Sequence, residues 1–185
     1  MNPPKLPHSI YSQTESPTRD DVEFEMLVGQ LVFILQDTEQ AIRFCDLVVF
    51  NPQEAQVTSD VFRSDKRWLG RLVQNLQKKT SLDNDFQRTL EAFVENRNIL
   101  IHRALDQPWW KAKNQGQFAG AFAFLKQLMD QTETVKLAFE AVVLDYMQDF
   151  NGEDTEVLEP FRRSGYLDAI KAFSEFSKAA IKRTD

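Results

Sequence analysis

The sequence predicts an all-α fold, an antiparallel up-and-down bundle of about five helices. Apolar residues recur at intervals of three and four over long stretches, and this spacing places them on one face of a helix. The chain contains only 6 Gly and 7 Pro and few β-branched runs, so little interrupts helices or favours strands. We find no convincing strand and no internal repeat in the sequence, and most connections are short enough for sequential helices to be neighbours.

The first two helices are expected at residues 21–50 and 64–79. Asp20 or Asp21 is suited to cap the first helix, because acidic side chains stabilise a helix N-terminus. The Asn51-Pro52 pair is a helix breaker and marks its end. The second helix is expected to end at Lys79, before the third helix begins near Asp83.

Three more helices are expected in the second half of the chain. The third begins near Asp83 and ends before Pro108, which cannot continue the helical hydrogen bonds. The fourth spans residues 117–149 and ends at Gly152. The last begins at Glu159 or Ser164 and extends to Lys182.

Length and composition indicate one globular domain. With 185 residues, 42% of them hydrophobic, the chain can bury a sizeable core. We expect residues 21–185 to form one helical domain after a Pro- and Ser-rich, poorly ordered tail at residues 1–20. The net charge of -6 makes the chain a poor general binder of nucleic acids, so any RNA binding must come from a local site.

The sequence gives no indication of a disulfide, a metal site or a membrane segment. A single cysteine, Cys45, excludes an internal disulfide and a multi-cysteine zinc site, and two His argue against a His-rich metal site. We therefore expect no metal or other cofactor. The N-terminal residues do not resemble a signal peptide, and no apolar run reaches the length of about 18 residues that spans a membrane. A cytoplasmic protein without membrane contact is expected.

The stretch "ENRNILIHR", residues 95–103, places charged and polar residues in the most apolar part of the third helix. At about 100° per residue, Asn98 lies about 100° and His102 about 140° around the helix from Arg97. Glu95, Asn98 and His102 share a second face. Arg97 itself lies near the middle of an apolar arc, formed by Leu90, Phe93, Val94, Leu100, Ile101 and Ala104.

An arginine in an apolar arc is either buried and paired, or it faces a cleft or a partner chain. Glu39 is the first choice of partner and Asp46 the second, because both lie on or beside the apolar face of the first helix. A bidentate Arg97–Glu39 pair would join the first and third helices. In this structural interpretation, which is the simpler one from spacing alone, Asn98 donates hydrogen bonds and His102 is half-exposed.

Arg97-Asn98, three further residues and then His102 resemble the signature of the HEPN superfamily of all-helical domains. A long first helix with Glu39, a shorter helix containing "WLGRLVQNL" and a motif late in the next helix are also similar in arrangement, over residues 21–150. The resemblance implies that Arg97 and His102 form a catalytic pair, with Asn98 orienting them. Glu39 matches the polar position of the first helix, and Glu95 is a further supporting candidate.

The resemblance implies a metal-independent endoribonuclease of a toxin or defence-type system. It also implies a homodimer whose two motifs meet in one cleft, and a nucleotidyltransferase-type antitoxin as a possible partner. RNA can cleave itself when its 2′-OH attacks the adjacent phosphate. His102 would then transfer the proton, and Arg97 would hold the phosphate. The alternative is a non-catalytic HEPN-like dimer that serves as an interaction or scaffold protein.

Four residues near the motif are candidates for contact with RNA: Arg103, Lys111, Lys113 and Trp109. The basic side chains would offset the acidity of the chain next to the motif, and the indole could stack on a base. Each has a simpler interpretation, because exposed basic residues are usually only solvated. Trp109 and its neighbour Trp110 are also typical of residues that close a core or fill an interface.

Overall fold

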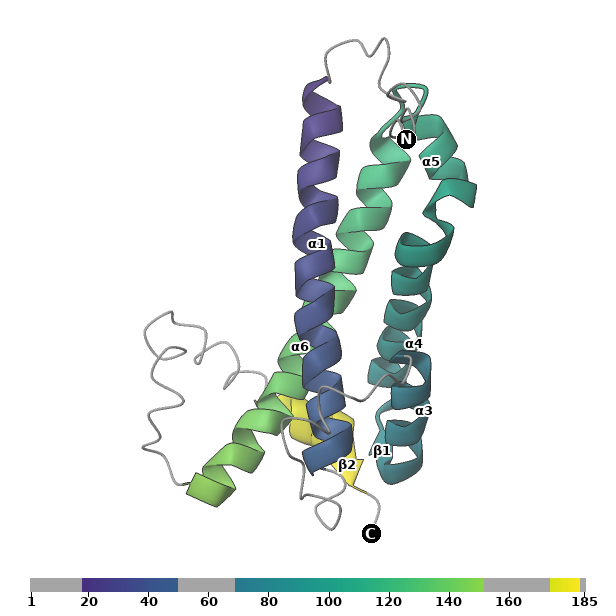
Figure 1. Ribbon diagram of the computed structural model, residues 1–185. Coiled ribbons are helices and arrows are strands. Elements are labelled where there is room, and N and C mark those ends of the chain that lie inside the picture. The colour runs from purple at the N-terminus through teal and green to yellow at the C-terminus, as the bar shows by residue number, and fades with distance from the viewer. Residues whose placement is uncertain (1–17, 50–68, 152–173, 184–185) are drawn as a thin grey trace, which may run out of the picture.

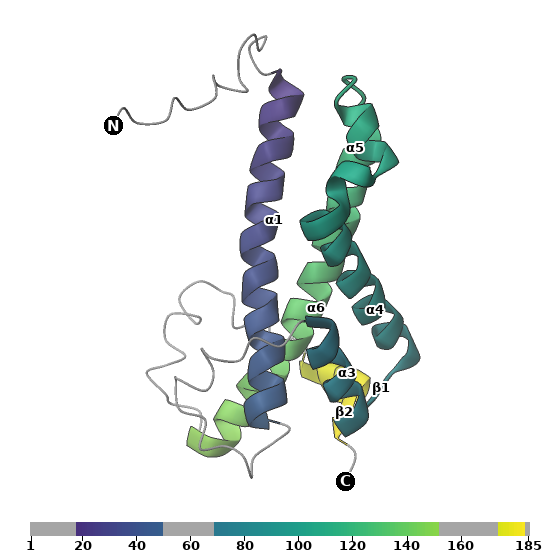
Figure 2. The same ribbon diagram turned by 45° about the vertical axis from the view of Figure 1, so that its right-hand side comes forward.

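The computed structural model describes residues 18–49, 69–151 and 174–183. Over these residues the predicted all-α fold is confirmed. Figures 1 and 2 show α1, α6 and the segment from α3 to α5 standing beside one another, with a very small sheet at one end. Helix α6 contacts α1, α4 and α5, so it is the central element of the bundle.

Helix α1, Arg19–Phe44, begins two residues earlier than expected. Its N-cap is Thr18, whose hydroxyl accepts a hydrogen bond from the Asp21 backbone N–H at 3.2 Å. Asp21 in return accepts from the Thr18 backbone N–H at 3.1 Å, which completes a capping box. The prediction of Asp20 or Asp21 as the cap was therefore wrong. The hydrogen bonds from Thr18 stabilise the carboxylate and lower the pKa of Asp21.

The chain beyond α1 does not stay α-helical. Residues Cys45–Val49 form a π-helical turn, η1, which continues α1 with wider hydrogen bonding. The predicted end at Phe50 lies outside the described residues, as do residues 64–68 of the second predicted helix. The described part of that helix is α3, Leu69–Lys79.

Helix α4, Asn84–Asn98, begins where the sequence predicts. The Asp83 side chain caps it by accepting from the backbone N–H groups of Asp85 at 2.9 Å and Phe86 at 3.3 Å. After Asn98 the chain continues as a π-helical turn, η2, Ile99–Arg103, and then as a short 3₁₀ turn, η3, Ala104–Asp106. The motif therefore lies where α4 changes its helical form.

A short helix, α5, Pro108–Lys113, was not predicted. Pro108 does end the preceding helix, but its fixed φ also suits the first position of a new one, so it begins α5. The chain then reverses at Gly116, whose φ of 78° is a left-handed conformation that favours glycine. Helix α6, Ala119–Asn151, follows and agrees closely with the predicted fourth helix.

The two strands are a correction to the predicted all-helical content. Strand β1, Thr80–Leu82, pairs antiparallel with β2, Ile181–Arg183, with Ser81 opposite Lys182. Residues 174–180 are helical, so the last helix ends before the predicted Lys182. The Asp83 backbone N–H donates to the Ala180 carbonyl at 2.8 Å and joins the helix end to the sheet.

The core lies between α1, α4 and α6 and extends to α3. Helix α6 turns an apolar face to both α1 and α4, which is why a single long helix can hold the bundle together. The Phe86 ring of α4 lies 6.1 Å from the Phe139 ring of α6 and 5.9 Å from Phe176. The most deeply buried side chains of the described residues include Leu31, Ile42, Leu72, Leu76, Phe86, Leu90, Phe93, Leu128, Val135 and Phe139.

An ion pair joins η1 to the end of α3. The Lys79 Nζ atom lies 2.7 Å from Oδ1 of Asp46, whose side chain is fully buried. Asp46, the second candidate partner for Arg97, is thus engaged by a different cation. Lys79→Met removes this cation from a buried carboxylate and should lower the free energy of unfolding by about 2–3 kcal/mol. Urea denaturation followed by circular dichroism measures the change.

Lys78→Met is the matched control, because Lys78 is the exposed neighbour on the same helix. It should change the free energy of unfolding by less than about 0.5 kcal/mol. Equal effects of the two substitutions would contradict a stabilising role for the Lys79–Asp46 pair.

Candidate functional site

Arg97 and Glu39 form the ion pair that the sequence predicts. The Arg97 Nε atom donates to Glu39 Oε1 at 2.8 Å, and its Nη2 atom lies 2.7 Å from the same oxygen. The two side chains are 18% and 21% exposed, so the pair is largely shielded from water. It joins the last turn of α4 to the C-terminal half of α1.

The other edge of the guanidinium faces the rest of the motif. Arg97 Nη1 donates to Asn98 Oδ1 at 3.1 Å and lies 3.4 Å from Nε2 of His102. Glu39, Arg97, Asn98 and His102 therefore form one group within a single chain, here called the motif cluster. A guanidinium can only donate hydrogen bonds, so in a hydrogen bond between these two groups Nε2 of His102 is the acceptor. The imidazole is exposed.

The placement of His102 corrects the expectation from helical spacing. A regular α-helix would put His102 about 140° away from Arg97. The π-helical turn η2 changes this, because its hydrogen bonds span five residues instead of four and each turn holds more residues. Residues five positions apart, such as Arg97 and His102, are thereby brought nearer to one another. No second chain is needed for them to meet.

The same turn separates Leu100 and Ile101, two apolar residues that the sequence places on one arc. Leu100 is buried, as predicted, whereas Ile101 is 42% exposed. Leu105 on η3 is 68% exposed. Neither exposed residue was a candidate in the sequence, because an α-helical wheel gives no sign of the π turn. They provide an apolar surface next to His102 in the chain.

The remaining candidates do not join the motif cluster. Glu95 is exposed on α4, and its side chain forms no hydrogen bond or ion pair within the described residues. Arg103 and Lys111 are also exposed, so both are accessible to a ligand. Trp109 is half-buried, and its ring stacks on Phe124 with centroids 4.8 Å apart.

Lys113 lies in an aromatic cluster at the other end of the bundle. Its Nζ atom is 5.1 Å from the centroid of Phe24, 5.4 Å from Trp110 and 5.7 Å from Phe118. It also lies 3.7 Å from Asp21 Oδ1. Asp21 and Glu39 are about 27 Å apart along α1 at 1.5 Å per residue. Lys113 is therefore held far from the motif cluster, by cation–π contacts and by the first turn of α1.

Cys45 lies in the core, as predicted. Its thiol is fully buried and donates to the Phe139 carbonyl at 3.6 Å. Burial, together with the neighbouring Asp46, raises the pKa of the Cys45 thiol far above its usual range. The thiol is thus poorly suited to nucleophilic chemistry in the folded chain.

Within the described residues, no three His, Cys, Asp or Glu side chains are grouped so that they could hold a metal ion. No helix of this part of the chain is both long and apolar enough to cross a membrane. Comparison with protein-family models, curated proteins and solved structures finds no match for the chain.

The Arg97–Glu39 contact can be measured by a double-mutant cycle. Glu39→Ala should lower the free energy of unfolding by about 1–2 kcal/mol, because it removes the carboxylate from a shielded guanidinium. With Arg97→Met and the double variant, the cycle should give a favourable coupling of about 1 kcal/mol. Thermal or urea unfolding supplies the values.

Asp37→Ala serves as the control on the same helix. The Asp37 side chain is 68% exposed and lies 3.7 Å from Lys136 Nζ, so its loss should cost less than about 0.5 kcal/mol. A coupling near zero between Glu39 and Arg97 would show that their contact adds nothing to the stability of the bundle.

Proposed function

We propose that the chain is a metal-independent endoribonuclease of the HEPN type, with the motif cluster as its active site. The observation that carries the proposal is the 3.4 Å approach of Arg97 Nη1 to Nε2 of an exposed His102. A permanent cation and an imidazole at this separation can act on one phosphate group. The resemblance of Arg97-Asn98-x-x-x-His102 to the HEPN signature suggests a toxin or defence system as the biological setting.

The proposed reaction uses the 2′-OH of RNA as nucleophile. The 2′-oxygen forms a bond to the adjacent phosphorus, the bond from phosphorus to the 5′-oxygen breaks, and a 2′,3′-cyclic phosphate and a 5′-OH result. Neutral His102 accepts the proton of the 2′-OH, or protonated His102 gives one to the leaving oxygen. Arg97 binds the phosphate and stabilises the charge that grows on it.

The other two residues of the motif cluster position the guanidinium. Glu39 holds Nε and Nη2 on one edge, and Asn98 accepts from Nη1 on the other. This fixes the plane of the group before any RNA binds, which lowers the cost of ordering it in the reaction. Exposed Arg103 adds positive charge one residue from His102. Because the whole chain is acidic, binding should depend strongly on this local charge.

The contact within one chain supports a site that is complete in each subunit. A homodimer with both motifs in one cleft, as in the HEPN resemblance, is the other form of the same proposal. A nucleotidyltransferase-type antitoxin as the natural inhibitor follows from the resemblance alone.

A non-catalytic HEPN-like scaffold is the second candidate. The observation in its favour is the commitment of Arg97 to Glu39, with only 18% of the arginine side chain exposed. Because Glu39 balances the charge of this guanidinium, the burial of Arg97 in the bundle is explained without a bound substrate. In that case the protein would act through its surfaces, and the motif cluster would serve stability alone.

RNA cleavage by the purified chain tests the two candidates. With EDTA present, the parent should cleave single-stranded RNA and leave 2′,3′-cyclic phosphate ends. His102→Ala and Arg97→Lys should each slow cleavage by about 10²-fold or more. His8→Ala is the control, because it removes the other imidazole of the chain. Labelled oligonucleotides resolved on gels give the rates, and circular dichroism verifies that the variants fold.

A substrate with 2′-O-methyl groups at every position lacks the nucleophile and should stay intact. If both motif variants cleave RNA as fast as the parent, the motif cluster is not the active site. If the parent leaves RNA uncut under all conditions in which it is folded, the scaffold function replaces the enzymatic one.

A further inference from the structure

The outer face of α1 carries large apolar side chains that are exposed in the described part of the bundle. Val22 is 54% exposed, Met26 55% and Phe33 72%, and Phe33 is the most exposed large hydrophobic residue in the described part of the chain. The buried side chains of α1 point the opposite way, about 180° around the helix. Solvent-facing positions of a bundle helix are normally polar, so this face is suited to contact with another surface.

The exposed residues follow the spacing of a coiled-coil seam. Val22, Met26, Gly29 and Phe33 are separated by four, three and four residues, and we call this set the α1 seam. A Cβ atom built on Gly29 would meet no atom within 4 Å, so the middle of the seam is open. At 1.5 Å per residue, the seam and its flanks from Arg19 to Asp37 extend for about 27 Å.

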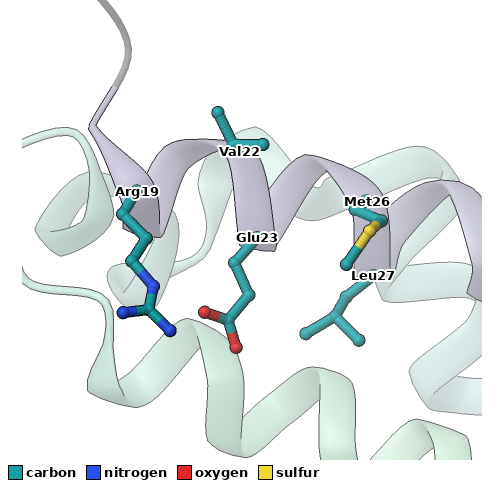
Figure 3. Close-up of a pocket in the computed structure, with 5 residues that line it drawn as sticks. All are labelled: Arg19, Val22, Glu23, Met26 and Leu27. Atoms are coloured by element: carbon teal, nitrogen blue, oxygen red, sulfur yellow. The ribbon is translucent and has the colours of Figure 1, made fainter.

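A groove lies beside the N-terminal half of the α1 seam. It is lined by Arg19, Val22, Glu23, Met26 and Leu27. Figure 3 shows Val22 pointing away from the neighbouring helix, whereas Arg19, Glu23 and Leu27 extend toward it. One half of α1 therefore offers an apolar hollow, and the other half offers an exposed phenyl ring.

We propose that the α1 seam binds the α1 seam of a second copy of this chain, with the two helices antiparallel. Phe33 of each subunit then enters the groove beside Val22 of the partner subunit, and Met26 packs against Gly29 of the partner subunit. A two-fold axis between Leu27 and Val28 relates the two contacts. The interface is thus self-complementary, as a two-fold dimer requires.

Charge complementarity favours this antiparallel register. It places Arg19 opposite Gln36 of the partner subunit and beside Asp37 of the partner subunit, on the same side of the seam. Both side chains are exposed, and Asp37, which also lies 3.7 Å from Lys136 Nζ of its own subunit, can accept Arg19 of the partner subunit as a second cation, which gives two equivalent ion pairs at the ends of the interface. A parallel pair would instead bring the two Arg19 side chains together and leave Phe33 without a groove opposite it.

The arrangement keeps the motif cluster outside the interface. Glu39 lies about 110° around α1 from the centre of the seam, on the flank that faces α4. Each subunit would keep its own cluster, and the two clusters would not meet in one cleft. The proposed dimer is independent of the proposed nuclease activity, since its evidence is the outer face of α1 alone.

Sedimentation velocity of the full chain over a concentration series tests the interface. The parent should show a monomer–dimer equilibrium, and Phe33→Glu should raise the dissociation constant about tenfold or more. Leu105→Glu is the matched control, because Leu105 has similar exposure but lies beside the motif cluster, and it should leave the constant unchanged. A monomeric parent, or a dimer broken by Leu105→Glu and not by Phe33→Glu, would overturn the proposal.

Disulfide trapping tests the direction of the pairing. Met26→Cys combined with Gly29→Cys should give a covalent dimer on mild oxidation, whereas Met26→Cys alone should not, and buried Cys45 should stay unreacted. Arg19→Asp and Asp37→Arg should each weaken the dimer, and their combination should restore it. Efficient trapping by Met26→Cys alone would indicate a parallel pair and refute the register.

Discussion

The ion pair between Arg97 and Glu39 is the constraint on which the arrangement around the motif depends. A guanidinium keeps its charge at any pH at which the bundle is folded, so burial in an apolar arc requires a carboxylate beside it. Glu39 supplies that carboxylate from α1, and the pair joins α1 to the last turn of α4. Because one edge of the guanidinium is engaged by Glu39, the Nη1 edge is the one left to face Asn98 and His102. The Arg97–Glu39 pair is therefore consistent with both the structural and the catalytic interpretation. Only the exposed imidazole of His102 beside Nη1 favours the catalytic one.

The π-helical turn determines which side chains the Nη1 edge of Arg97 contacts. If α4 had continued as a regular helix, His102 would lie on another face and Arg97 would meet only Asn98. The wider turn over Ile99–Arg103 moves His102 toward Arg97 while Leu100 stays in the core. Such turns weaken helical hydrogen bonding and are frequent at functional sites. Here one turn produces the cation–imidazole contact and leaves Ile101 exposed.

The long helices and the ion pair could be predicted because each follows from a local or periodic pattern. Helix α6 appears in the spacing of its apolar residues, and the start of α4 appears in Asp83. The partner of Arg97 could be predicted, because a cation in an apolar arc requires a carboxylate and few carboxylates lie near the apolar face of the first helix. The chemical roles of the motif residues are still predictions, since they depend on a resemblance.

Three features could not be predicted from the sequence: the Thr18 cap, the two short strands and the π-helical turn. Each was missed for a different physical reason. Thr18 forms its capping box with Asp21 in place of the usual Glu or Gln, so the signature was weak. The strands at Thr80 and Ile181 are three residues long and pair across a hundred residues of sequence, which no local period can reveal. The π turn leaves no mark in composition, because its residues Ile99–Arg103 suit an α-helix equally well.

Helix α1 has three distinct faces, because successive residues are separated by a fixed angle of about 100°. Its core residues, such as Leu31 and Ile42, face α6 and α3. Asp21 and Glu39 lie on one flank, where they meet Lys113 at one end of the bundle and Arg97 at the other. The α1 seam lies opposite the core, well separated from both. A side chain on the seam therefore points away from the Arg97–Glu39 pair. The proposed association through α1 and the proposed chemistry at the motif cluster therefore use different faces of the same helix, so that a substitution in one is expected to leave the other unchanged.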